Sequence, residues 1–463
     1  MNRLYLIIFF INFILSNEYN LDSLIKIGLE NSPSINLAVE ELKKARANSI
    51  EARSTALPKV QIFTSGTKNF NIAGQPISFP IFPGLLDQFG NPVSNDSLSY
   101  FQATGLIMSE IDLPMGTDYS GVFGINFNQT LFDGRVFAAI RASKIYDTYT
   151  EESYNEIVEK VIENIKISFY SVLLTKKVFK VFKKSLERAK SNFKNTELLF
   201  ESGNVNELEL IRAESLVKDQ ETFLKNAEKN KILALEQLCL VIGIKNVDNL
   251  NIIGSFKEIN FNILSLENYE KKLLKNQSQI RQLEASYLLS KENIKTYLSE
   301  FYPSISLSGA IHKIQSKNKE DFKFEFEHFQ DNTSLSINLS LPIFDGFGSK
   351  ARLMKAKADA KKIKYQSEDL KNNLLLELKS IYLNLNESME KIYAGETKLE
   401  LAKKGYSIAS DLFKNGMTTQ LDLLGAEINL NQAELNLIQA KFEYQIEMAK
   451  LSRSIGENTE RIK

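Results

Sequence analysis

Few residues in this chain have the types and spacing that catalysis or metal binding requires. The two histidines, His312 and His328, have no cysteine or second histidine at a metal-binding spacing, and no glycine-rich phosphate loop is present. The single cysteine, Cys239, lies in a helical pattern between Leu238 and Leu240 and is expected in a core, where free cysteines are usually found. The sequence therefore predicts a protein that is not an enzyme and that needs no metal or other cofactor.

Two carboxylates occupy a repeated position. Glu209 lies six residues after Gly203, and Asp422 lies six residues after Gly416. Rings of Asp or Glu around a pore favour cations. In a symmetric oligomer the Asp422 carboxylates would form such a ring at an entrance, with Glu209 as the second candidate. The alternative is that each acid only stabilises the first turns of its helix through the macrodipole.

The two glycines interrupt the longest helical patterns in the chain. Residues 135–242 contain no proline and one glycine, Gly203. Beyond it, two apolar series at seven-residue spacing, interrupted only at Gln220 and Lys231, are typical of a coiled coil. They are Leu210, Val217, Leu224 and Leu238, and Ala213, Ala227, Ala234 and Val241. A later series comprises Leu421, Ile428, Leu435, Phe442 and Ala449. We therefore expect long helical hairpins at 134–243, turning at 203, and at 346–456, turning at 416.

Four segments alternate apolar and polar residues: 59–70, 119–131, 304–314 and 333–343. Each is close to the ~9–11 residues that cross a bilayer when tilted, and apolar-out, polar-in alternation is typical of outer-membrane barrels. Four strands cannot close a barrel, and lipid does not tolerate an open sheet edge. Several chains must therefore share one barrel. Eight strands leave an interior just filled by side chains, so we expect three chains and twelve strands.

The chain is an internal duplication of mixed α and β structure. Leu57-Pro58 corresponds to Tyr302-Pro303, and Phe132-Asp133-Gly134 corresponds to Phe344-Asp345-Gly346. Asp133 and Asp345 are expected to cap helices where strand becomes helix, with Gly134 and Gly346 letting the chain bend. The predicted organisation is a first repeat, 18–243, with a helix at 21–56; a linker, 244–265; and a second repeat, 266–463, with a helix at 266–299. Residues 71–118, rich in proline and glycine, are predicted to be a long loop.

The first residues, 1–17, have the pattern of a secretory signal. Arg3 precedes an apolar core from Leu4 to Leu15, and Ser16 is a small residue where cleavage would occur. An uncleaved anchor is the alternative. No cysteine follows, so lipidation there is not expected. Lys plus Arg equals Asp plus Glu at 57 each, so no basic field favours nucleic acid.

These features together resemble the TolC-like outer-membrane channel family. The resemblance covers the duplicated order, the Leu-Pro and Tyr-Pro strand starts, both Phe-Asp-Gly motifs, and the two turning motifs Phe200-x-x-Gly203-x-x-x-x-Leu208-Glu209-Leu210 and Phe413-x-x-Gly416-x-x-x-x-Leu421-Asp422-Leu423. It implies a homotrimer with a twelve-stranded outer-membrane β-barrel that continues as a periplasmic α-helical barrel. It further implies the passive exit duct of a tripartite efflux pump or type I secretion system. The partners implied are a periplasmic adaptor and, through it, an inner-membrane transporter.

The resemblance also implies roles for the two turns. Asp422, Glu209, Thr418 and Phe413 would lie at the periplasmic entrance, although relatives have arginine at the position of Thr418, tyrosine at that of Phe413 and a second acid at that of Gly425. The docking tips for the adaptor are expected to be Gly203, Asn204, Val205 and Leu208, and Gly416, Met417, Thr418 and Leu421. The alternative function, a secreted coiled-coil structural or adhesive protein without a pore, explains the helices but neither the alternating strands nor the duplication.

Overall fold

The computed structural model describes residues 18–72, 74–81, 107–114, 116–245, 251–257, 263–318, 327 and 329–460. The expected signal segment, 1–17, and His328 lie outside these residues. The chain divides into two compact units. The helical unit comprises Met1–Ile50, Ala139–Ile294 and Ala351–Lys463, and the strand unit comprises Glu51–Ala138 and Lys295–Lys350.

Long helices dominate the described residues. The hairpin helices are α3 (Gly134–Glu201), α4 (Glu207–Ile242), α7 (Gly348–Lys414) and α8 (Gln420–Ser454). The others are α1 (Leu21–Asn31), α2 (Pro33–Ser54), α5 (Leu266–Asn276), α6 (Ser278–Leu298) and the short α9 (Glu457–Glu460), with a 3-10 turn at Ser299–Phe301. No helix among the described residues has the length and apolar character that a membrane span needs.

The single helices expected at 21–56 and 266–299 are each two helices, so these predictions were wrong. The first is broken at Ser32, because Pro33 lacks an N–H and suits the first turn of a new helix. The second is broken at Gln277, whose N–H closes α5 on the Leu273 carbonyl at 3.0 Å. The starts differ by 266 − 21 = 245 and 278 − 33 = 245 residues, so the break itself is duplicated.

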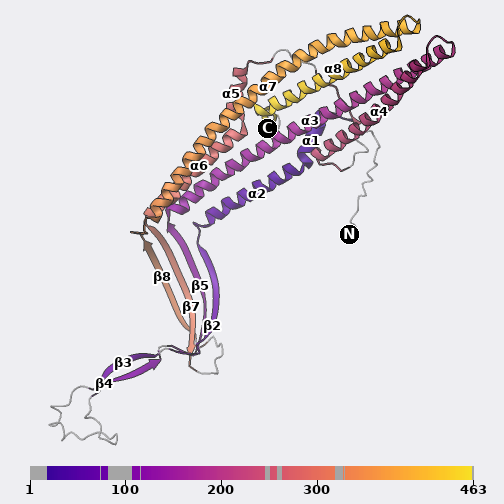
Figure 1. Ribbon diagram of the computed structural model, residues 1–463. Coiled ribbons are helices and arrows are strands. Elements are labelled where there is room, and N and C mark those ends of the chain that lie inside the picture. The colour runs from indigo at the N-terminus through magenta and orange to yellow at the C-terminus, as the bar shows by residue number, and fades with distance from the viewer. Residues whose placement is uncertain are drawn as a thin grey trace, which may run out of the picture. The chain divides into compact units, whose positions relative to one another are not determined.

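Each repeat has its own hydrophobic core in the helical unit. The first core joins α1, α3 and α4 around Leu24, Ile165 and Leu238, which are fully buried. The second joins α5, α7 and α8 around Leu273, Leu378 and Leu385. The two hairpins lie side by side with their reversals at the same end of the unit (Figure 1). Near that end, Leu424 of α8 packs against a small cluster of Ala189, Leu216 and Val217.

The coiled-coil prediction was confirmed for α4 and in part for α8, where Leu435 and Phe442 are half-buried and Ala449 is buried. All eight apolar residues of the two α4 series are buried or half-buried. In α8, by contrast, Leu421 and Ile428 are 59% and 56% exposed. The buried stripe of α8 instead includes Gln420, Leu423, Glu427, Leu430, Ala433, Leu437, Ala440 and Tyr444, at three- and four-residue steps. Polar residues therefore occupy part of the seam between the hairpins.

The strand unit contains one four-stranded antiparallel sheet in the order β2-β5-β7-β8. Its strands are β2 (Lys59–Lys68), β5 (Tyr119–Phe132), β7 (Ser304–Lys317) and β8 (Gln330–Ser340). Residues 341–343, expected to end the last strand, are not in a strand. The expected long loop 71–118 contains a hairpin of β3 (Gly74–Ile81) and β4 (Ile107–Pro114), which corrects that prediction. In the helical unit, β1 (Glu18–Tyr19) pairs in parallel with β6 (Asn251–Ile252), inside the expected linker.

The sheet has one apolar and one polar face. On the apolar face, one row across the sheet runs from Val60 through Phe127 and Gly309 to Leu335. The next row, on the other face, runs from Gln61 through Asn126 and Ala310 to Ser334. Large apolar side chains are left uncovered on the first face: Val60, Ile62, Leu335 and Ile337 are 64–73% exposed. A sheet with one bare apolar face must be covered by something other than water.

Candidate functional site

The first turn, between α3 and α4, is closed by its own backbone. Gly203 adopts φ 74°, in the left-handed region that favours glycine. The Gly203 N–H donates to the Phe200 carbonyl at 2.9 Å, and the Asn204 N–H donates to the Leu199 carbonyl at 2.8 Å. This pair of hydrogen bonds is the Schellman ending of a helix. The Asn206 side chain then caps α4 by accepting from the Glu209 N–H.

The second turn, between α7 and α8, has the same construction. Gly416 adopts φ 69°. Its N–H donates to the Phe413 carbonyl, and the Met417 N–H donates to the Leu412 carbonyl, both at 2.9 Å. The Phe-x-x-Gly spacing therefore specifies one loop geometry twice. The capping differs, because Thr419 and Asp422 form a reciprocal capping box at the start of α8.

Apolar side chains are presented to solvent at both turns. Leu208 is 52% exposed, Leu421 is 59% exposed and Met417 is 73% exposed. Val205 and Thr418 are half-buried, and Asn204 is exposed. Because the loops are fixed by backbone hydrogen bonds, the leucines are held in place on short, well-defined tips.

The two acids at the turns have different surroundings. Asp422 is exposed, and its Oδ2 accepts from Thr419 Oγ1 at 2.6 Å and Thr418 Oγ1 at 2.9 Å. Hydrogen bonds from Thr419 and then Thr418 lower the pKa of Asp422, so it is ionised at neutral pH. The side chain of Glu209 is only 18% exposed and pairs with Arg212 at 3.2 Å. Asp422 is therefore the more available negative charge.

Phe413 does not face an aqueous entrance. It is 3% exposed, so its ring packs inside the helical unit, and the sequence-based placement at the entrance does not fit this position. Gly425, at the position where the resemblance implies a second acid, is half-buried, and the space beside it is open. Of the four predicted entrance residues, only Asp422 and Thr418 combine solvent access with a polar contact to each other.

A buried polar cluster beside the turns was missed by the sequence reasoning. Glu427 of α8 is 1% exposed, and its Oε1 accepts from Arg188 Nε at 3.3 Å and from Ser185 Oγ at 3.2 Å on α3. Its Oε2 accepts from Asn192 Nδ2 at 3.4 Å. Arg188 Nη2 also donates to Asn431 Oδ1 at 2.5 Å. These residues join the first hairpin to the second through the seam.

The electrostatics of this cluster are dominated by burial. Desolvation raises the pKa of Glu427, and the nearby Arg188 guanidinium opposes that rise. Arg188 also lies over the Tyr406 ring of α7, 5.6 Å from its centroid. The cluster therefore contacts three of the four hairpin helices. Its signal in the sequence was the buried-stripe spacing that Glu427 shares with Leu423 and Leu430.

The two strand-to-helix junctions use glycine for different reasons. At the first, Asp133 Oδ1 accepts from the Arg135 N–H at 2.8 Å, and a Cβ on Gly134 would lie 2.4 Å from Ser299 Oγ. At the second, Gly346 has φ 67° with nothing near its missing Cβ, and Phe347 shares that φ. Helix α7 consequently begins at Gly348 rather than at the predicted position 346. Asp345 still caps it, because its Oδ2 accepts from the Ser349 N–H at 2.6 Å.

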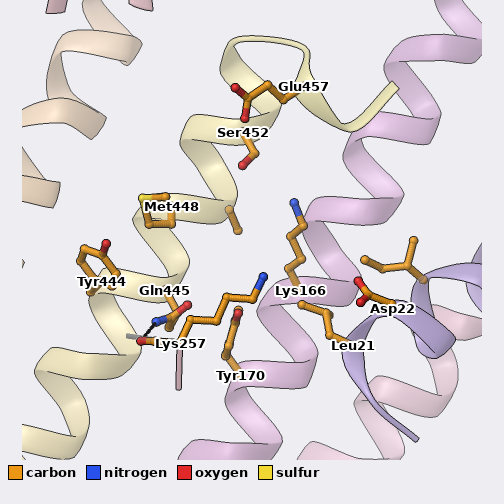
Figure 2. A pocket seen from close by; sticks show the side chains of 12 residues that line it. Leu21, Asp22, Lys166, Tyr170, Lys257, Tyr444, Gln445, Met448, Ser452 and Glu457 are labelled. Atoms are coloured by element: carbon orange, nitrogen blue, oxygen red, sulfur yellow. Dashed lines mark hydrogen bonds between the residues drawn. The ribbon is translucent and has the colours of Figure 1, made fainter. Parts of the chain in front are cut away.

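A cavity of about 250 Å³ lies between α1, α3 and the end of α8 (Figure 2). Lys166 and Lys257 line it, and Lys166 Nζ donates to Asn458 Oδ1 at 2.6 Å. Burial raises the pKa of Tyr170 to about 12, so its hydroxyl remains protonated at neutral pH. In the part of the chain that is described, no group of three His, Cys, Asp or Glu could hold a metal ion. Cys239 is buried, as predicted.

The sequence profile of the family described as "Outer membrane efflux protein" matches residues 24–244 and 270–457, the two repeats of this structure. The chain belongs to the outer membrane efflux protein family. This family is one of efflux proteins and not a class of enzymes. The chain is accordingly an outer-membrane protein, with its helical part in the periplasm.

The individual relatives of this chain are distant. It is 26% identical to nodulation protein T of Rhizobium leguminosarum bv. trifolii over 186 residues, 40% of this chain and 38% of that protein. It is 23% identical to outer membrane protein TolC of Vibrio cholerae over 168 residues, 36% of this chain and 38% of that protein. The chain thus matches less than half the length of these curated relatives.

The fold similarity is broader than the sequence similarity. The chain is similar to the CmeC outer membrane channel of Campylobacter jejuni with a TM-score of 0.75 at 18% identity, and the match covers 96% of this chain and 89% of that one. The fold of this chain is therefore that of the TolC-like channels, with long helices and an antiparallel sheet of the kind from which their α-helical barrel and β-barrel are built.

Proposed function

We propose that three copies of this chain form a passive exit duct of an efflux pump or secretion system. The observation that carries the proposal is the four-stranded sheet, with a bare apolar face and a polar face. In the described part of the chain, β2 and β8 each pair on one side only. A membrane sheet cannot leave such edges unpaired, so each must pair with another copy.

The strand directions fit this closure. Because neighbouring strands in the order β2-β5-β7-β8 are all antiparallel, β8 of one copy and β2 of the next would also be antiparallel. Three copies give twelve strands with regular alternation. Barrel diameter grows with strand number, and eight strands leave only a side-chain-filled interior, so twelve are needed for an open lumen.

The two turns are proposed to dock a periplasmic adaptor, which would connect the duct to an inner-membrane transporter. Exposed Leu208 and Leu421 on rigid tips suit an apolar contact with the adaptor's helical hairpin, as in helix-in-groove recognition. Asp422, ionised and exposed beside the second tip, is proposed to form a three-carboxylate ring that makes the periplasmic entrance cation-selective. Glu209, paired with Arg212, would contribute less.

The test is conductance of the purified protein in planar bilayers. Full-length protein from the membrane fraction should give discrete channels, and the fraction recovered without detergent should contain almost none of it. A secreted coiled-coil protein would instead be soluble without detergent and would produce no channels. That pair of results would contradict the proposal.

A further inference from the structure

We infer that His312 is a selectivity-determining residue of the duct, whose protonation adds a ring of positive charge inside the barrel. This inference rests on the proposed trimeric barrel, in which the polar face of the sheet lines the lumen. It concerns a different place from Asp422, because His312 lies on β7 of the strand unit and Asp422 on α8 of the helical unit.

The polar face of the sheet is almost uncharged. Along it, the described strand residues are mainly serine, threonine, asparagine and glutamine, and only Lys59 and His312 carry a titratable side chain. Lys59 is four residues before Phe63, the β2 residue in the row of His312, and so lies ~13 Å from that row along β2 at ~3.3 Å per residue. No carboxylate lies on this face among the described residues.

The other titratable groups of the four strands lie on the opposite face. Lys313 and Asp331 pair with each other there at 2.9 Å. The alternation along the strands also places the remaining titratable residues, Lys68, Tyr119 and Lys317, on the apolar face. Nothing charged on β2, β5 or β8 therefore stands next to His312 on the polar face to cancel a positive ring.

The imidazole of His312 is held by its neighbours. Its Nε2 lies 2.9 Å from Asn126 Oδ1 on β5. The Phe63 ring of β2 meets it edge-to-face, with centroids 5.0 Å apart and planes at 83°. Opposite His312 stands Gly124, where an added Cβ would come 2.6 Å from His312 Cδ2. The ring therefore occupies a space that the absent side chain of Gly124 leaves open.

This anchoring allows the charge to change while the ring stays in place. An amide oxygen only accepts hydrogen bonds, so Nε2 donates to Asn126 and the neutral ring carries its proton there. A second proton then binds Nδ1, and the bond to Asn126 survives. Histidine is the side chain whose charge changes between about pH 5 and 8. Three copies would place three such charges in one layer of the lumen, and charged rings set ion selectivity.

The experiment measures reversal potentials under a KCl gradient at about pH 8 and about pH 5, the range in which histidine titrates. Wild type should shift toward the chloride potential at the lower pH, and His312→Gln should lose that shift. His312→Arg, charged at both values, should show reduced cation preference at the higher pH and no shift. Asp422→Asn should have lower cation preference at both pH values and should keep the pH-dependent shift in reversal potential.

The outcomes separate the two ideas. If the wild type conducts and its pH-dependent shift in reversal potential persists in His312→Gln, this inference is overturned and the proposed duct stands. The same holds if that shift is lost only in His328→Gln. If the wild type forms no channels at both pH values, the proposed function itself is overturned. The intact mass of each variant in detergent shows whether it assembles like the wild type, and His312→Arg gives a second reading should His312→Gln assemble poorly.

Discussion

Replacing Glu427 by leucine should destabilise the helical unit by about 3 kcal/mol. Removing one partner of a buried ion pair costs about 3–5 kcal/mol, because the other charge is left without compensation. Glu427 is 1% exposed and accepts from Arg188, Ser185 and Asn192. Arg188 is 20% exposed and keeps its hydrogen bond to Asn431, so the lower end of that range applies.

The assay is urea unfolding of the detergent-purified protein, followed by far-ultraviolet circular dichroism. The control is Glu400→Leu on α7, where a carboxylate 69% exposed pairs with Lys404 at 2.9 Å and the midpoint should not move. The double change Arg188→Met with Glu427→Leu removes both charges and should recover part of the loss. The reasoning is refuted if Glu427→Leu behaves like the control, or if the two single effects simply add.

The same residue gives a pH dependence with a defined sign. Burial raises the pKa of Glu427 above its ordinary value of 4.5, so the folded protein binds this proton more tightly than the unfolded chain. The stability that is lost when this buried carboxyl ionises is fully present below pH 4.5. It is lost as the pH rises through the folded-state pKa. Glu427→Gln should therefore flatten the fall in stability between pH 4.5 and the folded-state pKa, measured as urea midpoints across the range.

Three further predictions concern the turns. Leu208→Asp and Leu421→Asp should each abolish export in cells while leaving trimer yield unchanged, and normal export by both would place the docking site elsewhere. Asp422→Asn should move the reversal potential toward lower cation preference, and an unchanged value would leave Asp422 as a helix cap only. Gly416→Ala should destabilise the protein by ~1 kcal/mol, because φ at this position is 69°. Gly405→Ala, on α7 with open space beside the glycine, should stabilise it by up to ~1 kcal/mol. Urea midpoints that move in the same direction in both variants would contradict this contrast.

Much of the fold followed from patterns that depend on local backbone geometry. Period-two alternation located all four strands of the sheet, because one face of each is apolar. The glycines at 203 and 416 located both turns, because a helix ending with positive φ favours glycine. Much of the α4 seam was also predictable, since its buried positions include Ala213, Val217, Ala227 and Leu238 of the two apolar series.

The errors occurred where packing overrides local pattern. In α8 the apolar series beginning at Leu421 is more regular than the true stripe, because Gln420 and Glu427 fill seam positions and are stabilised by α3. The junction at Asp345 was placed two residues early, since the positive φ of Phe347 cannot be read from its residue type. The break at Gln277 has no proline beside it, and only the duplication of the break at Ser32 could have revealed it.

The central claim is that sheets of three chains share one barrel, and the intact mass of the detergent-solubilised complex tests it most directly. The full chain is 52.6 kDa. The complex should have three times the mass of one subunit, determined separately after denaturation. Because a closed barrel has no free sheet edge, no smaller species should be in equilibrium with the complex. A monomer, or a dimer with only eight strands, would contradict the claim.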